Sequence, residues 1–135
     1  MRFLVVDDSP AMRKIVTNCL KRLGYHEVVE AENGASALTE LGKGGVDAVV
    51  TDWNMPGMDG LALVKKMRSD DRFKEIPVMM VTADSAKQDV ITAVQAGVND
   101  FVIRPFTARV FREKLDKILG QQANGAETMT GEMSK

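Results

Sequence analysis

Short runs of apolar residues impose the strongest constraint on how this chain can fold. Each run is continuous rather than alternating, as expected for strands that are covered on both faces of a sheet. The clear runs are residues 3–6, 48–50, 78–81 and 101–103, and a weaker one lies at 27–30. We therefore predict five buried strands.

Segments with helical spacing separate these runs. Apolar residues recur every three or four positions over residues 12–23 and 111–119, and shorter helices are predicted at 34–41, 60–70 and 87–96. Glycines that favour helix ends follow at Gly24, Gly42, Gly97 and Gly120. Five successive strand–helix units predict an α/β fold, a doubly wound parallel sheet of five strands with helices on both faces.

Length and charge limit the function classes. The 135 residues, 44% of them hydrophobic, suit one domain over residues 1–120, followed by a flexible polar tail at 121–135. The net charge of −1 gives no reason to expect nucleic acid or an anionic membrane as a partner. Because the first apolar run ends at Asp7 and Asp8, no signal peptide or membrane span is expected, and we predict a cytoplasmic protein.

Polar residues follow the predicted strands. Asp7 and Asp8 end the first, Asp52 the third, Thr82 the fourth and Arg104 the fifth. Ligands of open parallel sheets bind beyond the carboxyl ends of the strands, so these side chains are expected to form one site.

The residue types in this set indicate phosphoryl chemistry with a metal. Clustered carboxylates repel one another unless a cation compensates, and a donor set made only of oxygen favours Mg²⁺ over zinc. A carboxylate beside Mg²⁺ can attack a phosphoryl donor, while a cation and a hydroxyl neutralise the transferring oxygens. Asp52, Arg104 and Thr82 match those three roles.

Four motifs carry a family resemblance over about residues 1–120. They are VVDD at 5–8, TDWNMPGMDG at 51–60, VTAD at 81–84 and RPF at 104–106. In these the chain resembles the receiver domains of two-component response regulators, and within them the stand-alone, CheY-like regulators of chemotaxis. The resemblance implies a flavodoxin-like sheet with strand order 2-1-3-4-5.

The resemblance also implies individual roles in the site. Asp52 would be the phosphoacceptor, and Asp8 a direct Mg²⁺ ligand. Asp7 would act as a ligand through water and Asn54 through its backbone carbonyl. Thr82 would bind the phosphoryl group.

The same resemblance implies a switch. Phe101 would move inward when Thr82 is drawn toward the phosphate, and Asn54 and Asp84 would tune hydrolysis of the acyl phosphate. The surface formed by Phe101 and the helix at 87–96 would then change shape. The sequence leaves both cis and trans open for the Arg104–Pro105 bond.

Two residues depart from the family pattern. Arg104 stands where lysine is usual, which replaces a compact ammonium by a longer planar fork. Phe101 stands where the chemotaxis branch usually has tyrosine, so no phenol hydroxyl is available to a partner.

The function implied is signalling rather than metabolic catalysis. We predict a phosphoacceptor protein that assists its own phosphorylation and dephosphorylation. A histidine kinase would donate the phosphate, and a phosphatase is a further expected partner. The monomeric protein would bind a downstream target, for which the resemblance suggests a flagellar motor switch protein; another phosphorelay is the alternative.

Two rival classes share parts of the pattern. A Mg²⁺-dependent phosphatase of the haloacid dehalogenase type also forms an aspartyl phosphate, but it places an acid two residues after its nucleophile, where this chain has Asn54. A flavodoxin-like cofactor binder needs a Ser/Thr-rich phosphate loop after the first strand, where Asp7 and Asp8 would repel phosphate.

Overall fold

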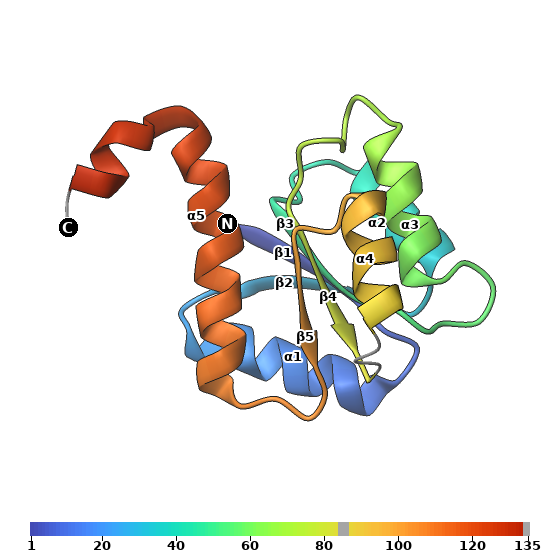
Figure 1. The fold of residues 1–135 in the computed structure, drawn as a ribbon. Helices are drawn as coiled ribbons and strands as arrows, with labels where there is room; N and C mark the ends of the chain where they lie inside the picture. Colours follow the sequence, from blue (N-terminus) through green and yellow to red (C-terminus); the bar gives the residue numbers. More distant parts are fainter. Residues whose placement is uncertain (84–86, 134–135) are drawn as a thin grey trace.

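The computed structural model describes residues 1–83 and 87–133, with the backbone alone at 87–89 and 121–133. Ten elements alternate between strand and helix along the chain (Figure 1). They are β1 (Arg2–Val6), α1 (Pro10–Arg22), β2 (Glu27–Ala31), α2 (Gly34–Gly42), β3 (Ala48–Asp52), α3 (Gly60–Arg68), β4 (Val78–Thr82), α4 (Lys87–Ala96), β5 (Asp100–Ile103) and α5 (Ala108–Met133). The predicted order of strands and helices is confirmed.

The five strands form one parallel sheet in the order β2-β1-β3-β4-β5. The order reverses between β1 and β3, and these two strands pair in register from Phe3 with Ala48 to Val6 with Thr51. The residues that follow β1 and β3 therefore meet at one edge of the sheet, which is where a doubly wound fold places its ligand site.

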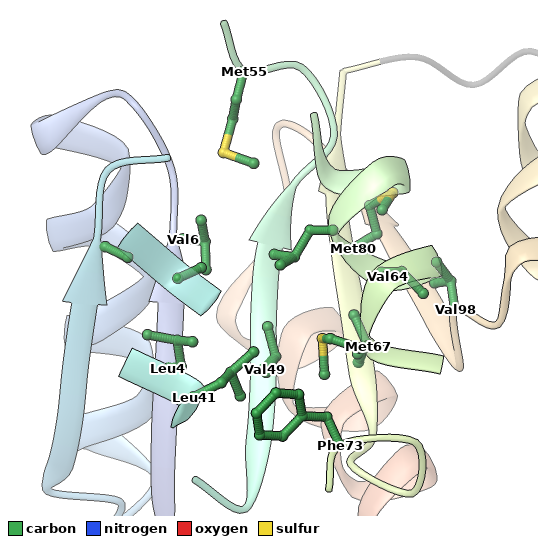
Figure 2. Packing of buried hydrophobic residues seen from close by; sticks show 14 of the residues in the cluster. Leu4, Val6, Leu41, Val49, Met55, Val64, Met67, Phe73, Met80 and Val98 are labelled. Atoms are coloured by element: carbon green, nitrogen blue, oxygen red, sulfur yellow. The ribbon is translucent and has the colours of Figure 1, made fainter. Parts of the chain in front are cut away.

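Helices cover both faces of the sheet (Figure 1). The core is accordingly divided into two clusters. One lies beneath α1 and α5 and includes Val16, Phe111 and Leu115. The other lies beneath α2, α3 and α4, and Figure 2 shows its packing from Met55 at one end to Phe73 at the other.

Burial explains why the strands read as continuous apolar runs. Every residue of β3 and β4 is buried, because helices pack on both sides of these central strands. The edge strand β2 is more exposed, which accounts for its weaker apolar pattern. Asp52 and Thr82, the last residues of β3 and β4, are polar exceptions with exposed fractions of 4% and 2%.

Helix α5 differs from its predicted length. The sequence predicts an end at Gly120, whereas the helix continues to Met133. That predicted helix end is therefore wrong, because glycine is tolerated within a helix at a cost of about 1 kcal/mol relative to alanine. The division into a domain at 1–120 and a flexible tail at 121–135 stays a prediction. Within the described part of the chain, no helix is long and apolar enough to span a membrane.

Candidate functional site

Three carboxylates meet at the carboxyl edge of the sheet. Asp7 and Asp8 follow β1 and Asp52 ends β3, and one oxygen from each lies within 4.8 Å of the others. Asp7 and Asp52 are buried, whereas Asp8 is exposed. The sequence prediction that these side chains form one cluster agrees with this geometry, and the cluster opens to solvent on the side of Asp8.

The surroundings of Asp52 destabilise its ionised form. Burial is the main cause, and the neighbouring Asp7 carboxylate adds to it; together they raise the pKa of Asp52 to about 6. The Arg104 guanidinium and the main-chain N–H groups of Asn54 and Trp53 partly oppose this rise. Burial likewise raises the pKa of Asp7, although the Ser9 N–H donates to its Oδ1 at 2.9 Å.

Arg104, the first residue after β5, approaches the same carboxylate. Its Nη2 lies 3.6 Å from Asp52 Oδ1, and its side chain is 25% exposed. Neither Asp52 Oδ1 nor Arg104 Nε has a hydrogen-bond partner among the described residues. The Arg104–Pro105 peptide bond is cis. Buried polar atoms that an ion pair leaves unmatched offer hydrogen-bonding capacity to a further group.

The donor set also suits a metal ion. Asp7, Asp8 and Asp52 offer only oxygen atoms, and one guanidinium, that of Arg104 at 3.6 Å from Asp52 Oδ1, leaves this oxygen without a hydrogen bond among the described residues. Hard divalent cations prefer carboxylate and carbonyl oxygen, so these residues fit Mg²⁺.

Arg13 supports the acidic cluster from α1. Its Nη1 donates to the main-chain carbonyl oxygen of Asp7 at 2.7 Å, and its Nε donates to Glu30 Oε1 on β2 at 2.9 Å. The turn that carries Asp7 and Asp8 is thus tied to its neighbouring strand. The sequence analysis did not identify Arg13, because a contact between residues 17 apart leaves no signal in local spacing.

Comparisons with known proteins agree with this geometry. The response regulator receiver domain family matches residues 3–116. Chemotaxis protein CheY1 of Helicobacter pylori is 54% identical over 121 residues, which cover 89% of this chain and 98% of that protein. Chemotaxis protein CheY-3 of Vibrio cholerae is 51% identical over 118 residues, covering 87% of this chain and 91% of that protein. The chain belongs to the response regulator receiver domain family.

Solved structures support the same assignment. The chemotaxis protein CheY4 of Vibrio cholerae matches with a TM-score of 0.81 and 30% identity, covering 87% of this chain and 97% of that chain. The receiver domain of a sensor histidine kinase from Pseudomonas aeruginosa matches with a TM-score of 0.79 and 26% identity, covering 88% and 97%. That structure contains a magnesium ion in its active-site cleft. Our protein is thus a receiver domain of the CheY type.

The remaining predicted residues of this receiver domain lie around the cluster. Asn54 is exposed in the loop after β3, and Phe101 is half-buried on β5. Thr82 is buried at the end of β4, which lies between β3, ending at Asp52, and β5, which Arg104 follows. Asp84 lies outside the described residues.

Gly60 is a second residue whose importance the sequence analysis missed, since Asp59-Gly60 reads as a plain turn and helix start. Asp59 does cap α3, accepting from the Ala62 N–H at 2.8 Å. The Gly60 N–H also donates to the Trp53 carbonyl oxygen at 2.8 Å. A Cβ at Gly60 would overlap the main-chain carbonyl oxygen of Asp52 and lie 3.1 Å from Met80 Cε. The start of α3 therefore packs directly against the backbone of the phosphoacceptor candidate.

Replacing Gly60 by alanine should consequently destabilise the receiver domain by about 1–3 kcal/mol, the usual range for an overpacked site. The same displacement of the Asp52 backbone should weaken Mg²⁺ binding, measured by titration of Trp53 fluorescence. Gly42→Ala is the matched control, because nothing lies within 4 Å of a Cβ at that helical position. Equal stability and Mg²⁺ affinity for both variants would contradict this packing argument.

Proposed function

We propose that this receiver domain accepts a phosphoryl group from a histidine kinase on Asp52, in a reaction that depends on Mg²⁺. The observation that carries the proposal is the position of Asp52: a 4% exposed carboxylate at the end of β3, beside two acids and 3.6 Å from a guanidinium. Buried acids with a charged partner are typical of functional sites, and the strand fixes the position of this one.

Four groups would hold the metal. They are the carboxylates of Asp7, Asp8 and Asp52 and the backbone carbonyl of Asn54. When bound, Mg²⁺ would neutralise the clustered acids and stabilise the charge on the transferring phosphoryl oxygens. The acidic cluster supports this assignment, and the related Pseudomonas aeruginosa receiver domain contains magnesium in its cleft.

The chain's own residues would then perform the transfer. An oxygen of Asp52 attacks the phosphorus of a phosphohistidine; the new O–P bond forms as the P–N bond breaks, and the imidazole leaves with the bonding electron pair and takes up a proton. Arg104 and the Thr82 hydroxyl would bind the phosphoryl oxygens. Hydrolysis of the acyl phosphate would reset the protein, and Asn54 and Asp84 would tune its rate.

The longer side chain of Arg104 is compatible with this role. A guanidinium pairs with phosphate through two N–H groups, and Nε of Arg104 is a buried donor that lacks a hydrogen-bond partner among the described residues. Phosphate oxygens placed between Asp52 and Arg104 would satisfy it.

The output would be a change of binding surface. Thr82, drawn toward the phosphoryl group, would allow Phe101 to move inward and alter the face formed with α4. Because relatives 54% and 51% identical to this chain are named chemotaxis proteins, we propose chemotaxis control in the cytoplasm, with a flagellar motor switch protein as target and a phosphatase as further partner. Another phosphorelay is the second candidate.

Intact mass after incubation with acetyl phosphate tests the proposal. With Mg²⁺ the protein should gain one phosphoryl group, and the gain should vanish without Mg²⁺ and in Asp52→Asn. Asp71→Asn is the matched control, because its side chain is 96% exposed and pairs with Lys74 at 3.3 Å. A phosphoryl gain that survives in Asp52→Asn would place the acceptor elsewhere.

A further inference from the structure

A third buried acidic residue, outside the proposed phosphorylation site, lies beside the predicted switch. Asp100 begins β5, immediately before Phe101, and its side chain is 9% exposed. The proposed phosphotransfer does not use it. A carboxylate this buried needs partners, so its contacts indicate what it does.

Two lysines from successive turns of α5 reach Asp100. Lys114 Nζ lies 3.5 Å from Asp100 Oδ1, and Lys117 Nζ lies 3.6 Å from Oδ2. The Phe101 N–H also donates to Oδ1 at 2.7 Å, whereas Oδ2 has no hydrogen-bond partner in the described part of the chain. The carboxylate thus connects the start of β5 to α5.

Lys114 makes a second contact that Lys117 does not share. Its ammonium lies over the ring of Phe101, 5.1 Å from the centroid. Cations are attracted to the face of an aromatic ring at this distance, and the attraction is stronger where water is partly excluded. The Lys114 side chain is 33% exposed and that of Lys117 is 63% exposed, so Lys114 is the more desolvated of the two.

We propose that Asp100 is a positioning residue for the switch: it holds the Lys114 ammonium against Phe101 and thereby stabilises the resting rotamer of the ring. Inward movement of Phe101 then requires loss of the contact with Lys114. This inference rests on the proposed function, because the rotamer of Phe101 matters to signalling only if the ring responds to phosphorylation.

Three variants separate this role from a general structural one. Asp100→Asn keeps an oxygen to accept from the Phe101 N–H but loses the charge that attracts the lysines. Lys114→Met keeps the apolar stem and removes the ammonium. Lys117→Met is the matched control, because Lys117 contacts Asp100 but no ring contact joins it to Phe101 among the described residues.

The readout is the χ1 rotamer population of Phe101, measured from three-bond couplings in the unphosphorylated protein. Asp100→Asn and Lys114→Met should each raise the minor rotamer about threefold, in the range expected for loss of a partly exposed cation–π contact. The double variant should resemble the single variants, because both remove the same interaction. Lys117→Met should resemble the parent. Unchanged rotamers in Asp100→Asn and Lys114→Met, or an equal change in Lys117→Met, would overturn the inference.

Intact mass with acetyl phosphate and Mg²⁺ is measured on the same samples. A parent protein that gains no phosphoryl group contradicts the proposed function, while the rotamer populations still decide whether Asp100 positions Phe101. Normal phosphorylation with parent-like rotamers in all variants rejects the positioning role alone.

Discussion

Replacing Asp52 by asparagine is expected to stabilise the metal-free protein by about 2–3 kcal/mol at pH 7. Burial and the neighbouring Asp7 raise the pKa of Asp52 to about 6, so the ionised carboxylate at pH 7 is unfavourable in the folded state. Asparagine has nearly the same shape without the charge. Urea unfolding in the presence of a chelator measures the difference.

The pH dependence of this difference follows from the direction of the shift. Because the pKa of Asp52 is higher in the folded state than its usual value of 3.8, the folded protein binds more protons than the unfolded chain between about pH 4 and 6. The contribution of Asp52 to stability is therefore fully present below pH 4 and is lost as the pH rises through 6. The advantage of Asp52→Asn should grow over that interval and level off above it.

Two controls make this prediction specific. Asp71→Asn removes an exposed acid and should change stability little at any of these pH values. Saturating Mg²⁺ should reduce the advantage of Asp52→Asn, since an ion that binds the folded carboxylate cluster stabilises the parent more. A parent protein at least as stable as Asp52→Asn at pH 7 without metal would show that the site tolerates the charge.

The sheet and the site were predictable from the sequence for one physical reason. Continuous apolar runs mark strands buried on both faces, and the polar residue that ends each run must lie at the carboxyl edge of a parallel sheet. Asp7, Asp52, Thr82 and Arg104 were therefore identifiable before any distance was known. Their spacing along the chain is large, but the topology brings them together.

The residues that support the site were not predictable in this way. Arg13, Gly60 and Lys114 act through contacts between elements, and such contacts depend on the packing of helices against the sheet. Gly60 in particular reads as a turn residue, whereas its lack of a side chain allows α3 to approach the Asp52 backbone. The extension of α5 beyond Gly120 was missed because glycine signals a helix end only on average.

Arg68 is another residue whose role became visible only in three dimensions. It ends α3, and its guanidinium lies at the edge of the sheet opposite the carboxyl ends of the strands. Nε and Nη2 donate to the Gly97 carbonyl oxygen at 3.0 and 2.9 Å, and Nη2 also donates to Asn99 Oδ1 at 3.0 Å. Nη1 donates to the carbonyl oxygens of Lys74 and Ile76 at 3.1 and 2.8 Å.

These bonds join the end of α3 both to the loop that follows it and to a segment about 30 residues further along the chain. The loop before β4, the end of α3 and the turn between α4 and β5 all meet at one side chain. Burial lowers the pKa of Arg68, as expected for a desolvated guanidinium. Gly97, with φ of +108°, fits closely here, because a Cβ at that position would lie 2.7 Å from Arg68 Cγ.

Arg68→Met is therefore expected to destabilise the protein by about 3 kcal/mol or more, because it removes several charge-assisted hydrogen bonds and leaves part-buried carbonyl groups without a donor. Arg68→Lys should lose an intermediate amount, since one ammonium group cannot reach both Gly97 and Ile76. Arg72→Met is the control: Arg72 lies in the loop after α3, its side chain is 66% exposed, and its loss should change the urea midpoint little. If Arg68→Met shifted the midpoint no more than Arg72→Met, the guanidinium would not be what holds these three segments together.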